Sequence, residues 1–339
     1  MNTTIRAYAA RAARAPLELF AYDAGPLGPE EVEVAVEYCG ICHSDLSMLD
    51  DDWGRSRYPL VPGHEAVGRI VAVGDQVKGR RPGERVGVGW FTASCMHCAS
   101  CTGGDLHLCG QSVEAIVGHH GGFAERVRAH WAWAIPLPEA LPAESSGPLF
   151  CGGITVFSPV VEFGIRPTDR VAVVGIGGLG HMAVKFLRAW GCEVTAFTSS
   201  ESKRDEALAL GAHRVVASRD GRAIKALAGH FDFILVTVNV ALDWPLLLAA
   251  LAPKGRLHFV GAVLEPVALP AFGLIGGQKQ VSGSPLGRPA TVATMLEFCA
   301  RHAIAPQVEV LPMSRVNEAL DRLREGRARY RLVLANDFA

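Results

Sequence analysis

The sequence predicts an α/β protein with two domains: a barrel-like region of short strands and a doubly wound parallel sheet. Three observations predict this fold class. Residues 1 to about 150 contain short strand-like runs bounded by turn residues. A glycine-rich motif from Gly175 to Gly180 lies between an apolar run and a helical stretch, and strand-like and helical stretches alternate from about Gly152 onward. A length of 339 residues also favours two domains.

The composition indicates an ordinary globular protein. Hydrophobic residues make up 49% of the chain, charged residues 20%, and the formal net charge is -1. A chain that is nearly neutral gives no reason to expect nucleic acid or an anionic membrane as a partner. No apolar run approaches the ~20 residues of a membrane-spanning helix.

The first residues leave two interpretations open. Up to Leu17 the chain contains Arg6, Arg11 and Arg14 but no acidic residue, which is compatible with a mitochondrial targeting segment. Alternatively, Ile5 to Ala9 form a first strand that is followed by a basic turn.

The strands of the first region follow from local patterns. Val32, Val34 and Val36 alternate with glutamates, which is the period-two pattern of a half-buried strand. Residues 68–74 and 85–88 are short apolar runs bounded by glycine, proline and charged residues. Many short strands with turn signals predict a barrel-like all-β region.

A thiol and an imidazole suggest a metal site within this region. Cys42 and His64 are far enough apart in the sequence to come from two elements, and Glu65 adds a carboxylate. Zinc prefers nitrogen and sulfur ligands, and a catalytic zinc keeps three protein ligands and one open position. Cys151 is the candidate third ligand. The alternative is a buried free cysteine and a surface histidine.

Four further cysteines predict a second metal site. Cys95, Cys98, Cys101 and Cys109 have spacings of three, three and eight residues, and four thiolates can close one tetrahedron. The zinc they bind would be structural, and His97 and His107 are expected to face solvent. A zinc-ribbon DNA-binding protein uses similar spacings, but the missing basic patch argues against it. Clustered cysteines indicate a reducing compartment, so a cytoplasmic location is expected.

The glycine-rich motif predicts a dinucleotide site. Gly175 allows the tight turn after strand 170–174, Gly177 lets a pyrophosphate approach the backbone, and Gly180 packs the helix on the strand. Gly178 and Leu179 complete the motif, and the pyrophosphate would lie at the helix N-terminus. A second strand follows at residues 193–197.

The end of that second strand indicates the cofactor. Ser199 and Ser200 can donate to a 2′-phosphate and Lys203 can neutralise it, whereas an enzyme that uses NAD usually has an acid here. Glu201 is such an acid nearby, so the choice between NADP and NAD stays open on the residues alone. A serine cap followed by a solvated charge run is the structural alternative.

The remaining elements complete both domains. Strand-like runs lie at 231–237, which ends in the candidate cofactor residue Thr237, and at 256–260 and 280–283. Residues 291–302 form a predicted amphipathic helix that returns the chain to the first domain, and residues 311–333 complete that domain.

Gly40-Ile-Cys-His-Ser-Asp45 and Gly63-His-Glu65 resemble the catalytic-zinc signatures of the medium-chain alcohol dehydrogenases, in particular the cinnamyl-alcohol-dehydrogenase-like branch. The resemblance extends from about Gly40 to Val333. It implies a GroES-like barrel catalytic domain over 1–151 and 288–339, with a structural-zinc lobe at about 90–110. A Rossmann cofactor domain over 152–287 is inserted into it. The family begins with a strand, which favours the strand at the N-terminus, and the resemblance implies a homodimer.

The resemblance also assigns roles to residues. It implies two zinc ions per chain, and the ligands of the catalytic ion would be Cys42, His64 and Cys151. Ser44 would pass the alcohol proton on, Asp45 would orient His64, and Glu65 would approach the metal when the substrate position empties. His43 would lie near the cofactor phosphates and Thr155 near the nicotinamide. The pattern of two serines followed by a lysine is similar to that of the branch that prefers NADPH.

Two departures affect the expected site. Many relatives have a relay histidine where this chain has Ser47, which cannot act as a base near neutral pH, so the proton would leave through ribose and water or through His43. The connection 110–120 is shorter than in many relatives, which implies a more open pocket. Trp90, Pro285 and Leu286 fall at positions that line the family's substrate site.

These observations predict a zinc-dependent alcohol dehydrogenase or aldehyde reductase. It would transfer a hydride between NADP(H) and an alcohol/aldehyde pair, with aliphatic or aromatic aldehydes as substrates. An NAD-dependent polyol or secondary-alcohol dehydrogenase is the nearest alternative. A silent zinc- and nucleotide-binding protein, or a zinc-ribbon interaction module fused to a nucleotide-binding domain, are the alternatives from other classes.

Overall fold

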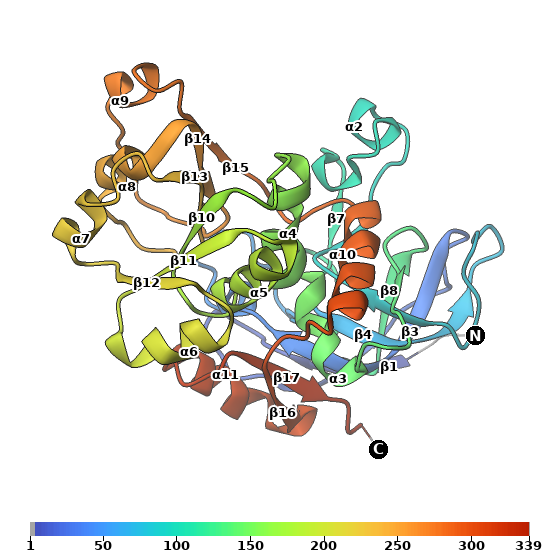
Figure 1. Ribbon diagram of the computed structural model, residues 1–339. Coiled ribbons are helices and arrows are strands. Elements are labelled where there is room, and N and C mark those ends of the chain that lie inside the picture. The colour runs from blue at the N-terminus through green and yellow to red at the C-terminus, as the bar shows by residue number, and fades with distance from the viewer. Residues whose placement is uncertain (1–3, 339) are drawn as a thin grey trace. The chain divides into compact units, whose positions relative to one another are not determined.

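The computed structural model describes residues 4–338 (Figure 1). The chain divides into two compact units. Unit 1 comprises residues 1–154 and 287–339, and unit 2 comprises residues 155–286.

Unit 1 is built on a seven-stranded sheet around the long strand β3 (Glu31–Ile41). The sheet runs in the order β16-β17-β3-β4-β5-β9, and β8 also pairs with β3. The other strands are β4 (Ala66–Val73), β5 (Arg85–Val88), β8 (Arg126–His130), β9 (Ile135–Pro136), β16 (Val308–Pro312) and β17 (Arg331–Ala335). Because β3 pairs with β17, β4 and β8 along its length, residues from both ends of the chain meet on it.

The period-two pattern of β3 is only partly the predicted one. Val32 and Val34 are fully buried, as the pattern predicts. Glu33, which the alternation places toward solvent, is also buried. Its carboxylate forms ion pairs with Arg126 at 2.5 Å and Arg128 at 2.9 Å, both from β8, and these partners compensate the charge for the loss of water.

Smaller elements complete unit 1. β1 (Thr4–Ala9) and β2 (Glu18–Asp23) form an antiparallel hairpin, so the strand predicted at residues 5–9 is present. β6 (Phe91–Ala93) and β7 (Val113–Glu114) form a second hairpin. The helices are α1 (His43–Leu49), α2 (Ala99–Thr102), η1 (Leu106–Leu108), α3 (Ala143–Ser146), η2 (Gly147–Phe150), α10 (Pro289–His302), η4 (Met313–Arg315) and α11 (Val316–Arg324).

Unit 2 contains the predicted doubly wound parallel sheet. Its six strands run in the order β12-β11-β10-β13-β14-β15, and every neighbouring pair is parallel. They are β10 (Arg170–Val174), β11 (Glu193–Thr198), β12 (Arg214–Ala217), β13 (Phe231–Val236), β14 (Leu251–Phe259) and β15 (Gln280–Gly283). The central strands are almost continuously apolar because helices cover both faces of such a sheet.

The helices of unit 2 alternate with these strands. They are α5 (Gly180–Trp190), η3 (Glu201–Lys203), α6 (Arg204–Ala209), α7 (Gly221–Lys225), α8 (Trp244–Ala250) and α9 (Ala271–Ile275). α4 (Gly152–Glu162) begins at the boundary between the two units. One side of the sheet core packs Phe197, Phe231 and Leu257 against Trp244 of α8.

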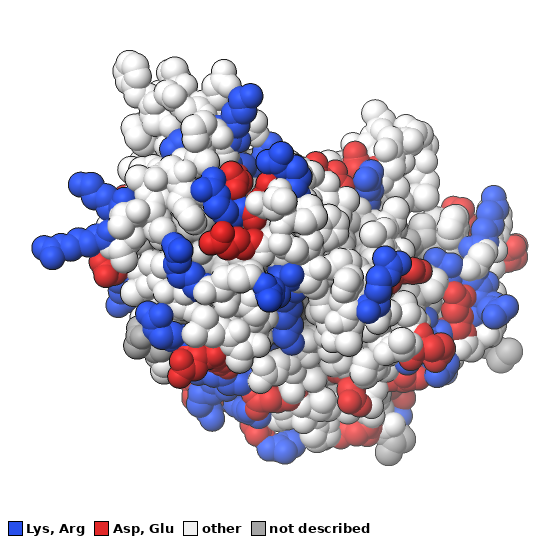
Figure 2. Space-filling view, in the orientation of Figure 1, with Lys and Arg blue, Asp and Glu red and all other residues white. Residues whose placement is uncertain are grey.

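The surface has no strong charge bias on the face that Figure 2 shows, where acidic and basic side chains are interspersed. Among the residues that the structure describes, no helix combines the length and apolar character needed to cross a membrane.

Candidate active site

Cys42 is held at the junction of β3 and α1. It occupies the N-cap position of α1 in extended backbone conformation. The carboxylate of Asp45 accepts a hydrogen bond from the Cys42 backbone N–H at 2.9 Å. This bond satisfies a donor at the helix start and fixes the position from which the thiol extends.

Asp45 also fixes the second segment of the site. Its Oδ1 atom accepts hydrogen bonds from the Gly63 N–H at 2.9 Å and from His64 Nδ1 at 3.0 Å. Gly63 has φ +98°, and a Cβ there would lie 2.6 Å from the Phe123 ring, so the turn requires glycine. Since Nδ1 donates to Asp45, the lone pair of His64 Nε2 is available to a metal.

Cys151 completes the group from the end of η2. Its Sγ lies 3.3 Å from His64 Nε2 and 3.8 Å from Cys42 Sγ. The approach of η2 depends on Gly147, because a Cβ there would lie 2.5 Å from the Glu65 carbonyl oxygen. Three segments that are distant in the sequence therefore converge on one point.

Glu65 lies in the same group and has a partner that the sequence reasoning missed. One of its oxygens accepts a hydrogen bond from Arg331 of β17, while Oε2 has no partner among the described residues. Both side chains are buried. Burial raises the pKa of the Glu65 carboxyl, and the Arg331 charge opposes this rise. Gly40 makes room for the carboxylate, because a Cβ at Gly40 would overlap Glu65 Oε2.

The four side chains form a donor set that suits zinc. Ligand atoms of Cys42, His64, Glu65 and Cys151 all lie within 4.8 Å of one another. A hydrogen bond from Cys151, together with one from His64, lowers the pKa of the Cys42 thiol well below its ordinary value. Burial works against a charged imidazole, but the Asp45 carboxylate still raises the pKa of His64. Two sulfurs and one imidazole match a three-ligand catalytic zinc, and the Glu65 carboxylate offers a fourth donor atom in the same group.

The polar side chains that follow Cys42 in the sequence differ in their burial and in their contact with its sulfur. The Ser44 hydroxyl lies 3.7 Å from Cys42 Sγ. Ser47 is buried at 8% exposure, and His43 is exposed at the start of α1. Ser44 is therefore the hydroxyl that the structure brings next to the metal ligands.

Aromatic side chains line one side of the group. The Trp90 ring is buried and lies edge-on to the His64 ring, with centroids 5.0 Å apart. Trp53, from the loop after α1, lies edge-on to Trp90 at 6.1 Å. Trp53 was missed in the sequence reasoning; a single large aromatic residue inside an acidic loop was the available signal. Pro285 and Leu286, the other predicted lining residues, belong to unit 2.

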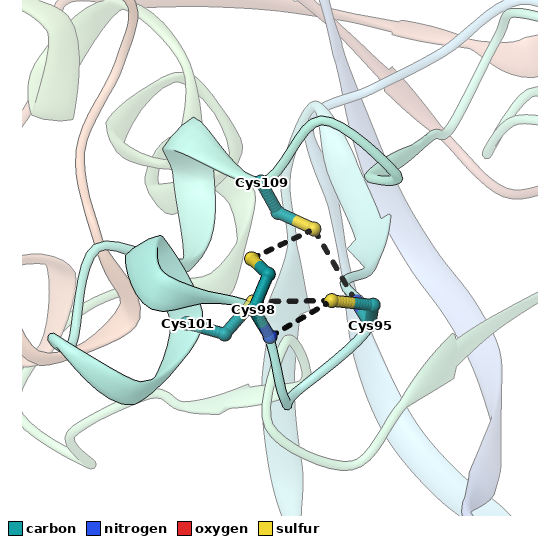
Figure 3. A group of neighbouring side chains, drawn as sticks. All are labelled: Cys95, Cys98, Cys101 and Cys109. Carbon is teal, nitrogen blue, oxygen red and sulfur yellow. Dashed lines mark hydrogen bonds between the residues drawn. The ribbon is translucent and has the colours of Figure 1, made fainter.

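The four-cysteine lobe forms a separate group between β6 and β7 (Figure 3). Cys95 and Cys101 sulfurs are 3.9 Å apart, as are those of Cys98 and Cys109. Backbone N–H groups point at the sulfurs, as in Cys98 N to Cys95 Sγ at 3.4 Å. Backbone donation from His97 and Cys98 lowers the pKa of Cys95 to about 6. Such a set suits a closed, four-coordinate zinc.

The two histidines beside the lobe differ in exposure. His97 faces solvent, and its Nδ1 lies 2.6 Å from the Cys95 carbonyl oxygen. His107 is half-buried rather than solvent-facing. The four cysteines alone supply a complete ligand set, so neither imidazole is needed for it.

The glycine motif of unit 2 has the shape that a pyrophosphate needs. Gly175 has φ +97°, and a Cβ at Gly180 would overlap the Gly175 carbonyl, so both positions require glycine. A Cβ at Gly177 would meet nothing within 4 Å, which leaves its backbone open to a ligand. The motif continues through Gly178 and Leu179, and Leu179 caps α5. The N-terminus of α5 follows this motif directly, and the helix dipole favours an anion there.

Neighbouring side chains support this motif. The Thr237 hydroxyl lies 2.9 Å from the carbonyl oxygens of Val174 and Gly175, so it holds the turn after β10. The Lys203 ammonium donates to the Ile176 carbonyl at 3.0 Å, which places a cation beside the motif. Thr155 lies partly buried on α4.

Two serines lie between β11 and η3. Ser199 is exposed, and the Ser200 hydroxyl lies 2.6 Å from that of Ser202. The structure thus brings hydroxyls and a lysine to the carboxyl end of β11, where a dinucleotide's ribose lies in this fold.

Comparison with known proteins agrees with the fold and the donor sets. Residues 28–139 match the family model of the alcohol dehydrogenase GroES-like domain, and residues 178–301 match that of the zinc-binding dehydrogenases. The chain is 54% identical over 332 residues to aldehyde reductase AdhA of Synechocystis sp., covering 98% of this chain and 99% of that protein.

Solved structures show the same similarity. A cinnamyl alcohol dehydrogenase of Sorghum bicolor superposes with a TM-score of 0.94 at 39% identity, covering 98% of each chain. A cinnamyl alcohol dehydrogenase of Helicobacter pylori, complexed with NADP(H), superposes with a TM-score of 0.91 at 30% identity, covering 99% of each chain. With this similarity along its whole length, the chain belongs to the zinc-dependent medium-chain alcohol dehydrogenase family, in its cinnamyl-alcohol-dehydrogenase-like branch.

Proposed function

We propose that this protein is a zinc-dependent aldehyde reductase that transfers a hydride between NADP(H) and an alcohol/aldehyde pair. The observation that carries the proposal is the convergence of Cys42, His64 and Cys151 on one buried point, beside the Ser44 hydroxyl. The similarity to an aldehyde reductase over almost the full length of both chains supports the same reaction class.

Each residue of the site has a chemical role in this proposal. Cys42, His64 and Cys151 would hold a zinc ion, which supplies Lewis-acid polarisation of a carbonyl when bound. Asp45 keeps Nδ1 of His64 protonated and the ring in place. Ser44 would accept and pass on the proton of the alcohol. Ser47 is buried and has no basic group, so the proton path beyond Ser44 would run through the cofactor ribose and water.

Glu65 and Arg331 would serve this site as a buried pair. The Arg331 guanidinium offsets the carboxylate charge beside two thiols. Glu65 Oε2 has no partner among the described residues, and one oxygen of this carboxylate lies within 4.8 Å of the other ligand atoms. The carboxylate would therefore be able to approach a bound metal when the substrate position empties. Without Arg331, the Glu65 carboxylate would be buried and unpaired, which would lower the stability of the folded protein.

We propose NADP(H) as the cofactor on the basis of unit 2. The glycine motif would bind the pyrophosphate, with Ser199, Ser200 and Lys203 at the position of the 2′-phosphate. The relative from H. pylori is complexed with NADP(H), which supports the choice. A nicotinamide bound in this unit would supply the hydride chemistry, and Thr155 would contact it.

The substrate class follows from the aromatic wall. The Trp90 ring lies beside His64 and the Trp53 ring lies against Trp90, and this apolar wall suits a hydrophobic aldehyde better than a polyol. Pro285 and Leu286 would add apolar surface from unit 2. The substrates would therefore be aromatic and longer aliphatic aldehydes.

An assay of purified protein tests these proposals. NADPH oxidation is measured with aromatic, aliphatic and polyol-derived carbonyl substrates, together with zinc content. We expect two zinc ions per chain and the highest kcat/KM with aromatic aldehydes. A preference for polyol oxidation with NAD would favour the polyol dehydrogenase alternative, and cofactor binding without turnover would favour the silent binder.

Two zinc ions and two domains are part of the same proposal. The second zinc would be held by Cys95, Cys98, Cys101 and Cys109. The catalytic domain would comprise residues 1–151 and 288–339, and the cofactor domain residues 152–287. The division of the chain into two units near residues 154 and 287 supports these boundaries.

The edge of the unit 2 sheet supports a homodimer. β15 ends the strand order, and Val281 on it is exposed. Leu264, Phe272 and Ile275 nearby are 75%, 87% and 68% exposed. On the face that Figure 2 shows, the surface at α9 itself is uncharged. An apolar edge strand is a ready surface for pairing with a second copy. We also propose a cytoplasmic location, since all nine cysteines are free thiols.

A further inference from the structure

Trp53 lies on a loop that is closed at its base. The loop runs from Asp50 to Tyr58, between α1 and β4. The Ser56 N–H donates to Asp51 Oδ1 at 3.0 Å, and the Tyr58 hydroxyl donates to the Leu49 carbonyl at 3.0 Å. These bonds tie the ends of the loop to the end of α1 and leave the middle, with Trp53, to be positioned by other contacts.

Arg55 supplies such a contact from the middle of the loop. Its guanidinium lies 2.5 Å from a carboxylate oxygen of Glu114. The Arg55 side chain is 50% exposed, whereas Glu114 is only 16% exposed. The carboxylate is therefore the more fixed partner, and it determines where the loop is held.

Glu114 is joined through the backbone to Trp90. It pairs with Phe91 across the β6–β7 hairpin, and the N–H of Ala115 donates to the Trp90 carbonyl at 2.7 Å. The ion pair thus connects β7, which pairs with the strand that follows Trp90, to the loop that carries Trp53. Their rings lie edge-on, 6.1 Å apart, and Trp90 lies against His64.

We propose that Arg55 and Glu114 are positioning residues that hold Trp53 against Trp90 and so determine the affinity for bulky hydrophobic aldehydes. This inference rests on the proposed function. Arg55 is half-exposed, and an ion pair near the surface contributes little to global stability, so its loss frees the loop without unfolding the protein. Because β7 follows Cys109 closely, the same pair links the aromatic wall to the four-cysteine lobe.

Kinetics with two sizes of substrate test the proposal. Arg55→Gln and Glu114→Gln should each raise KM for an aromatic aldehyde about threefold, which is the effect that an ion pair near the surface can have. Their kcat, and KM for a short aliphatic aldehyde, should stay at wild-type values. Arg11→Gln, which breaks the more exposed Arg11–Glu18 pair elsewhere in unit 1, is the control and should change neither KM value. Arg55→Glu combined with Glu114→Arg should restore the aromatic KM.

A spectroscopic signal tests the positioning independently of any substrate. Two tryptophans in edge contact give an exciton couplet in circular dichroism, which is isolated here as the difference between wild type and Trp53→Phe. Arg55→Gln should lose most of this couplet and the charge-reversed double variant should regain it. An intact couplet in Arg55→Gln overturns the inference. If the couplet responds as expected but no aldehyde is reduced, the proposed function fails and the positioning role stands.

Discussion

The carboxylate of Asp45 joins the two segments that carry Cys42 and His64, so the site depends on single side chains. Replacing the partner of a metal ligand typically costs about 10- to 100-fold in metal affinity or activity. Loss of a metal ligand itself should therefore reduce metal affinity or activity by more than this factor.

We predict that Cys42→Ala and Cys151→Ala each lower kcat by more than about 100-fold and retain the fold. Each removes one of three ligands from the group. Zinc content, kcat and circular dichroism are measured together. Cys299→Ala, at a buried cysteine outside both donor groups, is the control and should keep both zinc ions. Wild-type rates in a Cys42→Ala protein that has lost one zinc would contradict the assignment.

Cofactor choice is also decided by individual residues. Ser199→Asp combined with Lys203→Ala should shift the ratio of kcat/KM from NADPH toward NADH by at least about tenfold. The variant removes a charge-assisted contact worth about 1.5–3 kcal/mol and adds a repulsion, and 1.4 kcal/mol corresponds to a factor of ten. Steady-state rates with both cofactors measure the ratio. A wild type that already prefers NADH would refute our interpretation of residues 198–204, while the zinc chemistry would stand.

At the scale of elements, the lobe between β6 and β7 contains only the short helices α2 and η1, and its four thiols form one group. Cys98→Ser should therefore lower the melting temperature by roughly 5 °C or more, before it affects chemistry, because metal binding to such a site is coupled to local folding. Thermal unfolding and kcat at a moderate temperature are compared with those of Cys299→Ala. An unchanged melting temperature together with lost activity would mean that the two metal sites have been exchanged.

β14 and β15 are joined by a buried imidazole. His258 Nδ1 and Nε2 each lie 2.9 Å from a serine hydroxyl, Ser282 and Ser284, and the ring is buried between Phe163 and Phe233. Burial and the Arg256 charge lower the pKa of His258 to about 4. The unfolded chain, with a pKa of about 6.5, binds the proton more readily between pH 4 and 6.5, so stability is lost as the pH falls through this range.

His258→Asn should consequently flatten the pH dependence of stability. In the wild type, His258 should make the free energy of unfolding about 1 kcal/mol lower at pH 5.5 than at pH 7.5. Urea unfolding at both pH values measures this difference, and it should shrink in the variant. His302→Asn, at an exposed position, is the control. An identical pH dependence in wild type and His258→Asn would show that the buried imidazole does not titrate in this range.

The elements that could be predicted from the sequence are those with local signals. Strands such as β10 and β15 have short apolar or alternating patterns, and the turn after β10 requires glycine for local reasons. The two cysteine groups were found because zinc needs particular atoms. Contacts between distant segments had no such signal: Glu33 is buried because β8 supplies two arginines, and Glu65 pairs with Arg331, which is 266 residues away.

At the scale of the whole molecule, the proposed dimer would form through the apolar edge strand β15 of unit 2. Val281→Asp should shift the protein toward a monomer, since a charge on an edge strand opposes pairing. Size-exclusion chromatography with light scattering measures the mass of wild type and variant over a range of concentrations. Val310→Asp, at an exposed apolar position on β16 of unit 1, is the control. A wild type that is monomeric at all concentrations would exclude the dimer.

The three hydrogen bonds of Asp45 mean that the Cys42–His64 corner is assembled by protein atoms alone. The emptied site should therefore keep its shape, and a metal could be exchanged there in the folded protein. Cobalt could then replace zinc after mild chelation, and its visible absorption would report on this pocket without a signal from the lobe. Because Asp45 holds the ligands in place without a metal, the site would accept different metal ions. The metal supply during growth would then determine which ion the enzyme carries.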